Sequence, residues 1–181
     1  MLNFLIQLYN KFTRKIISPF VVKIYLKLKK VQTGKNSEFK GKPFIINNGS
    51  IVIEDNVIIN SSYYSNPIGG NTFSTIWVKP LGSLIIKNNA KISNAAIVTS
   101  KKIEIGQYTY IGGDCKIYDT DFHSLLSKER IQNPDPGIKC AEIIIEDHVF
   151  IGGGSTILKG VTIGKHAVIG AASVVTKDIP P

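Results

Sequence analysis

The feature that most constrains this chain is a six-residue repeat over residues 145–180, which reads IEDHVF, IGGGST, ILKGVT, IGKHAV, IGAASV, VTKDIP. An aliphatic residue opens every block: Ile145, Ile151, Ile157, Ile163, Ile169 and Val175. The fifth position holds a small or β-branched residue: Val149, Ser155, Val161, Ala167 and Ser173. A helix with 3.6 residues per turn cannot keep a period of six, whereas hexapeptide repeats are typical of a parallel β-helix. In an extended segment these two positions share one face, so a large and a small side chain point together into a narrow interior.

The repeat continues towards the N-terminus less regularly. Aliphatic residues open further blocks at Ile53, Ile59, Ile86, Ile92 and Val98 and, after a slip of one residue, at Ile105, Ile111 and Ile117. The period fails between Asn60 and Gly82, where turn formers and aromatic residues predict a loop or an irregular coil. Residues 31–50 contain several glycines and a proline, and we interpret them as an irregular bridge into the repeat.

A second interruption, from Ile117 to Ile145, is polar and contains prolines. Two regular stretches that flank such a segment predict an extruded loop over residues 118–144, and long loops on regular scaffolds are commonly functional. The expected fold class is therefore all-β. We expect a parallel β-helix over residues 31–181 with one extruded loop, preceded by a short N-terminal helical segment.

Residues 1–30 predict that basic amphipathic helical segment. Apolar residues recur at roughly helical spacing, and the charged residues are all Lys or Arg. Charges interrupt every apolar run before the ~18 residues that a membrane-spanning helix needs, and no signal-peptide cleavage site is evident. Pro19 is expected to divide the segment into two helices. Two interpretations stay open: helices that pack on the β-helix end or on a neighbouring subunit, and a basic element that lies on an anionic membrane.

Composition limits the partners and the compartment. The net charge of +9 attracts anionic partners, but no nucleic-acid-binding motif accompanies it, so no nucleic acid is expected. The two cysteines, Cys115 and Cys140, lack metal-ligand spacing and cannot form a disulfide framework, which favours a reducing, cytoplasmic compartment. Cys115 occupies the fifth position of a block, so we expect it in the core.

The blocks IGQYTY, IGGDCK and IYDTDF, the histidine that follows them, and the closing VFIGGGSTILKGVTIGKHAVIGAASVVTKDIPP resemble the hexapeptide-repeat acyltransferases. The closest branch is that of the galactoside and maltose O-acetyltransferases and their polysaccharide-modifying relatives. The resemblance is strong over residues 103–181, fair over 51–102 and absent before 31. It implies a left-handed β-helix with three blocks per coil, a homotrimer, and acetyl-coenzyme A in a groove between adjacent chains.

Transfer of an acetyl group from a thioester to a sugar hydroxyl requires a base that exchanges a proton near neutral pH. Histidine is the usual choice. His123 matches the family's catalytic histidine, and the flanking Asp119 and Asp121 offer a carboxylate that can orient the ring; the alternative is a solvated loop histidine. His148 and His166 are 18 residues apart, so with three blocks per coil they should stack on successive coils at a corner. No third ligand follows from the spacing, and no metal is expected.

The resemblance implies further site residues. The acceptor-binding candidates are Asn94, Asp121 and Arg130, and the cofactor-binding candidates are Phe150, Gly153, Ala171, Thr176 and Lys177. Structural alternatives stay open, since Asn94 also suits a plain turn, Arg130 a solvated surface, and Gly153 and Ala171 tight packing at a corner. Phe150 stands where many relatives have tryptophan, and a cation at Lys177 suits a phosphate.

The expected activity is acetyl-coenzyme A-dependent O-acetylation of a sugar hydroxyl in cell-surface polysaccharide biosynthesis, in the cytoplasm or at the inner face of the membrane. The same scaffold also fits an N-acetyltransferase of an amino sugar or a serine acetyltransferase. Alternatives of another class are a carbonic anhydrase-like metal protein and a non-catalytic scaffold.

Overall fold

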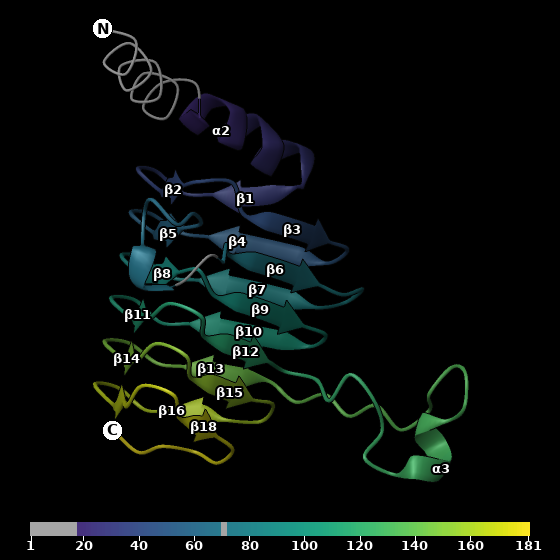
Figure 1. Ribbon diagram of the computed structural model, residues 1–181. Helices are drawn as coiled ribbons and strands as arrows, with labels where there is room; N and C mark the ends of the chain where they lie inside the picture. The colour runs from purple at the N-terminus through teal and green to yellow at the C-terminus, as the bar shows by residue number, and fades with distance from the viewer. Residues whose placement is uncertain (1–17, 70–71) are drawn as a thin grey trace, which may run out of the picture.

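Three parallel six-stranded sheets form the sides of a left-handed β-helix in the computed structural model, which describes residues 18–69 and 72–181 (Figure 1). The first sheet contains β1 (Val31–Thr33), β4 (Ser50–Ile53), β7 (Ser83–Ile86), β10 (Lys102–Ile105), β13 (Ile143–Ile145) and β16 (Thr162–Ile163). The second contains β2 (Glu38–Lys40), β5 (Ile58–Asn60), β8 (Lys91–Ser93), β11 (Tyr110–Ile111), β14 (Phe150–Ile151) and β17 (Val168–Ile169). The third contains β3 (Phe44–Asn47), β6 (Thr75–Val78), β9 (Ala96–Thr99), β12 (Lys116–Tyr118), β15 (Thr156–Leu158) and β18 (Val174–Val175). The predicted fold class is confirmed.

Three columns of aliphatic side chains, one for each sheet, form much of the core. The parallel register stacks Ile53, Ile86, Ile105, Ile145 and Ile163 in the first sheet and Ile59, Ile92, Ile111, Ile151 and Ile169 in the second. The third column holds Ile45, Ile76, Ile97, Ile117, Ile157 and Val175. All of these side chains are buried. Truncating one of the isoleucines to alanine should cost about 2–5 kcal/mol of stability, because the stacked coils leave little room to collapse.

Three details differ from the expectations. The stretch between Asn60 and Gly82, expected to be a loop or an irregular coil, contains the regular strand β6. Residues 31–50 are not an irregular bridge, since β1, β2 and β3 form the first coil. Thr33 and Phe39 stand there in register with Ile53 and Ile59, and these substitutions hide the repeat in the sequence. In the third coil Ile97 occupies the core column in place of Val98, because the turn after β8 is one residue shorter than the period.

The corner between the first and second sheets requires a residue in the left-handed region in each coil. Six non-glycine residues adopt it: Asn36, Asn56, Asn89, Tyr108, His148 and His166, with φ from 55° to 64°. The rings of the last three stack, with centroids 5.1 Å apart for Tyr108 and His148 and 5.0 Å apart for the two histidines. The predicted stacking of His148 on His166 is confirmed.

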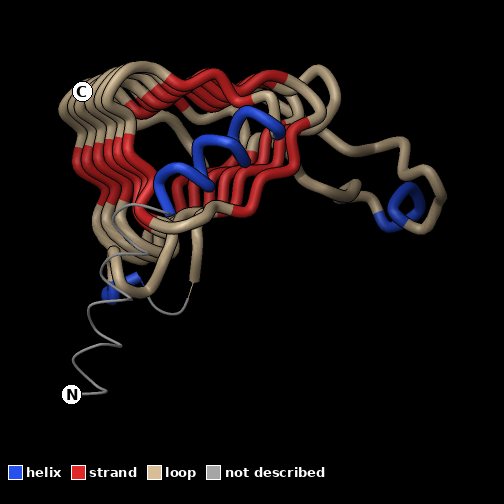
Figure 2. Tube along the Cα trace, turned by 90° about the horizontal axis from the view of Figure 1, so that it is seen from above, coloured by secondary structure: helices blue, strands red, loops and turns tan. Residues whose placement is uncertain are grey.

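Two insertions leave the coils. Residues 61–74, which include the short 3₁₀ helix η2 (Pro67–Gly69), lie between β5 and β6. Residues 119–142, which include α3 (Ser127–Arg130), lie between β12 and β13 and project from the side of the prism (Figures 1 and 2). The larger insertion leaves the corner between the third and first sheets, on the side away from the second sheet (Figure 1).

The helix α2 (Ser18–Leu28) lies across the N-terminal end of the prism (Figure 2). Val22 and Leu26 are buried against the first coil, and the Tyr25 hydroxyl accepts a hydrogen bond from the N–H of Ile45 at 3.0 Å. Of the two interpretations of the N-terminal segment, packing on the β-helix end is the one that α2 shows within this chain. The expected division at Pro19 lies at the start of α2, and residues 1–17 lie outside the described residues. None of the described helices is long and apolar enough to cross a membrane.

Candidate active site

The extruded loop is fixed to the β-helix at its base by Asp119. Its buried carboxylate accepts hydrogen bonds from the hydroxyl of Thr99 at 2.6 Å and from the N–H groups of Ser100 and Lys101 at 2.6 and 2.8 Å. The two strands of the loop then pair through the Asp121 N–H and the Lys139 carbonyl at 3.0 Å. Asp119 is therefore an anchor of the loop, and its carboxylate does not orient a histidine as the sequence suggested.

His123 lies just beyond this anchored base. Its side chain is 70% exposed, and Nδ1 lies 3.6 Å from Oδ2 of Asp135, which comes from the returning strand of the loop. The N–H of Ser124 donates to Asp135 Oδ2 at 2.7 Å and is the main cause that lowers the pKa of Asp135; the Gly137 N–H and His123 add to this effect. The carboxylate beside His123 thus stays ionised, and the other ring nitrogen of His123 has no partner among the described residues.

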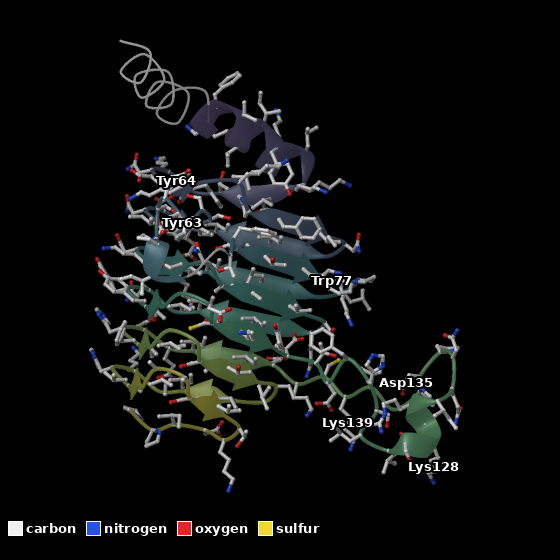
Figure 3. The ribbon with its side chains drawn as sticks, viewed as in Figure 1. Tyr63, Tyr64, Trp77, Lys128, Asp135 and Lys139 are labelled. Carbon is white, nitrogen blue, oxygen red and sulfur yellow. The ribbon has the colours of Figure 1, made fainter. Side chains whose placement is uncertain are left out.

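Ser124 organises the loop around His123. Its hydroxyl donates to Glu129 at 2.7 Å and accepts from the Leu126 N–H at 3.1 Å, and its carbonyl accepts from Nη1 of Arg130 at 2.9 Å. The predicted acceptor-binding Arg130 therefore bonds the backbone of its own loop. Figure 3 shows Asp135 inside this loop, well to the side of the prism.

Asp121 is the other acceptor-binding candidate of the loop. Its Oδ1 pairs with Nζ of Lys159 from the next coil at 2.7 Å, whereas Oδ2 is buried with no hydrogen-bond partner among the described residues. A buried carboxylate oxygen without a donor is costly unless a ligand or water supplies one. Asp121 thus has one buried oxygen without a donor, two residues from His123.

An aromatic surface next to the loop was missed by the sequence analysis. Trp77 and Tyr118 lie on the outer face of the third sheet with Val98 between them, and the ring of Phe122 packs edge-on against Tyr118 with centroids 5.2 Å apart. Nζ of Lys79 lies 5.4 Å from the ring centroids of both Trp77 and Phe122. Figure 3 shows Trp77 on the same side of the prism as the loop. Outward positions of the repeat carry no period, which is why no sequence pattern marks this surface.

The cofactor-binding candidates lie elsewhere. Phe150 is 49% exposed on the outer face of the second sheet, in register with Tyr110 and Val168. Gly153 and Ala171 follow at the next corner, where a Cβ added to Gly153 would lie 3.0 Å from a carbonyl oxygen of the preceding coil. Tight packing therefore explains this glycine without a ligand.

Thr176 and Lys177 are exposed at the C-terminal end of the prism. They line a groove of about 420 Å³ together with Val168, Val174 and Ile179. No ion pair holds Lys177 within the described residues. The groove joins the end of the second sheet to the last strand of the third.

Asn94 is buried at the corner between the second and third sheets. Its amide Nδ2 contacts the carbonyl of Asn66 in the first insertion at 3.4 Å, and its Oδ1 has no partner among the described residues. Within one chain Asn94 and Phe150 do not share a side with His123, because the loop leaves from the opposite corner (Figure 1). A site that contains all of these residues needs a second copy of the chain.

The described residues also show where the cysteine core candidate lies and whether metal-ligand side chains are grouped. Cys115 is fully buried, its thiol lies 3.2 Å from the carbonyl of Gly152, and burial raises its pKa, so its expected place in the core is confirmed. No three His, Cys, Asp or Glu side chains of residues 18–69 and 72–181 are grouped to hold a metal ion.

Comparison with known proteins identifies the family of this chain. A sequence model described as the hexapeptide repeat of succinyl-transferase matches residues 142–177. The chain is 34% identical to the galactoside O-acetyltransferase of Lactococcus lactis over 128 residues, which are 71% of this chain and 55% of that protein. The chain belongs to the hexapeptide-repeat acyltransferase family. It spans about half the length of the curated relatives that it matches first, 55–56%.

Solved structures of family members have the same fold. A mutant of AntD, an N-acyltransferase from Bacillus cereus, in complex with dTDP and coenzyme A superimposes with a TM-score of 0.66 and 26% identity, over 85% of this chain and 79% of that one. A hexapeptide-repeat acetyltransferase of Vibrio cholerae in complex with acetyl-coenzyme A gives a TM-score of 0.56 and 25% identity, over 87% and 67%. One of these neighbours binds coenzyme A and the other binds acetyl-coenzyme A.

Proposed function

We propose that this protein transfers the acetyl group of acetyl-coenzyme A to a hydroxyl group of a carbohydrate, with His123 as the general base. The observation that carries the proposal is the exposed His123, paired with an ionised Asp135 on a loop that its own hydrogen bonds order. A carboxylate at Nδ1 leaves Nε2 free to accept a proton and stabilises the imidazolium that forms. The family membership and the coenzyme A bound by its neighbours support the donor.

In the proposed reaction Nε2 of His123 takes the proton of the acceptor hydroxyl as its oxygen attacks the thioester carbonyl. The tetrahedral intermediate then collapses, the C–S bond breaks, and the imidazolium returns the proton to the coenzyme A thiolate. Trp77 and Phe122 provide apolar surface for the sugar ring. Asp121 accepts a second hydroxyl of the acceptor in this proposal, which requires its buried Oδ2 to become exposed when the acceptor binds. Backbone N–H groups of the groove stabilise the oxyanion.

The proposed site lies between chains of a homotrimer. His123 and its loop come from one chain, and Phe150, Gly153 and Ala171 come from the neighbour, with Thr176 and Lys177 towards the phosphates. This division is supported by the placement of the loop and of the second sheet on opposite sides of the prism (Figure 1). An acceptor in cell-surface polysaccharide biosynthesis fits an aromatic, lysine-bearing surface that is open to a long chain.

The second candidate is N-acylation of an amino sugar, which the likeness to an N-acyltransferase supports. O-acetylation and N-acylation differ in what the base must do. A neutral amine attacks without first losing a proton, whereas a hydroxyl is a weak nucleophile that needs the base to take its proton.

The test is coenzyme A release from acetyl-coenzyme A with matched hydroxyl and amino sugars, for the wild type and His123→Ala. We expect turnover with the hydroxyl acceptor to fall by about 10²–10⁴-fold in the variant. His166→Ala, at an exposed corner position, is the matched control and should keep full turnover. Turnover with amino sugars alone would favour the second candidate, and an active His123→Ala enzyme would contradict the assigned base.

A further inference from the structure

The helix α2 has two apolar faces, and only one of them is buried among residues 18–69 and 72–181. The inner face packs Val22 and Leu26, each 3% exposed, on the first coil. The outer face carries Phe20, Val21, Ile24 and Leu28, which are 66%, 50%, 47% and 75% exposed. Phe20, Ile24 and Leu28 are four residues apart and form one continuous line along the helix. A helix that only covers the end of the β-helix needs no apolar residues on its outer face. The stripe of Phe20, Ile24 and Leu28 therefore requires another explanation.

Lysines border the stripe on both flanks. On one flank Lys23, Lys27 and Lys30 lie on a groove of about 770 Å³ between α2 and the first coil, which Lys35 also lines. On the other flank Lys29 and Lys42 border a groove of about 390 Å³ and lie over the ring of Tyr25, with Nζ of Lys42 4.7 Å from its centroid. The residues that line these two grooves include no Asp or Glu, and the first acidic residue of the sequence is Glu38.

We infer that the outer face of α2 docks the protein on an anionic lipid surface, with the stripe of Phe20, Ile24 and Leu28 in the headgroup–acyl boundary and the lysines on lipid phosphates. An apolar stripe with lysines on both flanks is the pattern of a helix that lies in the plane of a membrane interface. If the outer faces of α2 from two chains met, the lysines beside one stripe would lie against the same lysines of the other chain. This repulsion opposes association of two chains through α2.

The position of α2 in the fold allows this docking. The helix lies across one end of the prism, so its outer face points along the prism axis and away from the three sheets (Figures 1 and 2). A flat surface can approach this end without contacting the extruded loop, which leaves from the side several coils away. In the proposed trimer of parallel prisms three such helices face the same way, and three weak contacts add in avidity.

The experiment is flotation of the full-length protein with vesicles of mixed phosphatidylglycerol and phosphatidylcholine and with vesicles of phosphatidylcholine alone. We expect binding to the anionic vesicles that weakens at high salt, because salt screens the lysine contacts. Ile24→Gln/Leu28→Gln should lower the partition about tenfold or more, since it removes two apolar anchors. Lys23→Gln/Lys27→Gln should lower it about fivefold for each lysine removed.

Two control double variants remove the same number of exposed apolar residues or lysines from parts of the surface away from α2. Ile68→Gln/Leu81→Gln alters two residues that are 95% and 96% exposed away from α2, and Lys101→Gln/Lys165→Gln alters two lysines that are each 57% exposed. Both controls should bind vesicles like the wild type. Circular dichroism and coenzyme A binding report whether each variant is folded.

Three results would overturn the proposal. The first is equal binding to neutral and anionic vesicles. The second is anionic binding that both α2 double variants retain. The third is sedimentation without lipid in which Ile24→Gln/Leu28→Gln reduces the particle mass, because the stripe would then join copies of the chain.

Discussion

At the scale of single residues, the proposed chemistry depends on how His123 is held. The two aspartates that precede it in sequence serve the loop base and Lys159, whereas the partner of its ring is Asp135, twelve residues further along. Asp135 is itself held by the Ser124 and Gly137 N–H groups, which point its carboxylate at the imidazole. The carboxylate is thus in place before the imidazolium forms.

Asp135→Asn should lower kcat by about tenfold or more, which is less than the loss expected for His123→Ala. The amide keeps the shape but not the charge, so the protonated imidazole loses stabilisation. The acidic limb of the rate profile should therefore move to lower pH. The pKa of Asp135 is lowered in the fold, so the wild-type carboxylate stays charged as the pH falls towards the ordinary aspartate range.

The measurement is kcat and kcat/KM against pH for the wild type and Asp135→Asn, with Asp114→Asn as a control at an exposed corner. A purely structural role for Asp135 would lower activity equally at every pH. An unchanged profile would therefore count against the pairing with His123.

At the scale of elements, the extruded loop is a small ordered unit that the β-helix anchors at one point. Asp119 accepts three hydrogen bonds from a single turn of the preceding coil, and it is fully buried. Charged hydrogen bonds of this kind are worth more than neutral ones, and removal of the acceptor leaves buried donors unpaired.

Asp119→Ala should destabilise the protein by about 3 kcal/mol or more, since three donors lose their acceptor. Limited trypsin digestion should then cleave the loop faster at Lys128, Arg130 or Lys139, and turnover should fall with it. Thr99→Val removes only one of these bonds and should show a smaller effect of the same sign. A loop that stays protected in Asp119→Ala would show that the Ser124 hydrogen bonds alone keep it ordered.

The inward-facing part of this fold could be predicted from sequence because the core repeats. Each block places one aliphatic residue in a column, so Ile145 to Val175 determine the strands, and the same spacing placed His148 over His166. The prediction was wrong where the core departs from the period. Thr33 and Phe39 replaced isoleucine in the first coil, and a shortened turn moved the column from Val98 to Ile97.

The site was less predictable because its contacts are aperiodic. His123 was found through the family motif, but its pairing with Asp135 depends on how the loop folds back on itself. The aromatic surface of Trp77 and Phe122 joins an outward strand position to an insertion, and no spacing rule connects them. The functions of Asn94, Arg130 and the cofactor candidates stay predictions.

At the scale of the whole molecule, the placement of the site residues argues for catalysis between chains. The loop with His123 leaves one corner of the prism, and Phe150 lies on the opposite sheet (Figure 1). If these residues belong to one site, as we propose, a single chain carries its two halves on opposite sides. In the proposed trimer, a closed ring of head-to-tail contacts would join each loop to the second sheet of the next chain.

Mixed trimers test this arrangement directly. His123→Ala and Phe150→Asp should each be nearly inactive alone, because every site contains one defective half. Co-assembled in equal amounts, they should recover roughly a quarter of the wild-type rate, since one of the four pairings of neighbours combines an intact loop with an intact second sheet. Mass measurement of the mixture confirms that the chains have exchanged. If exchanged trimers stay inactive, both halves must come from the same chain, and if Phe150→Asp alone is active, the cofactor does not lie against the second sheet.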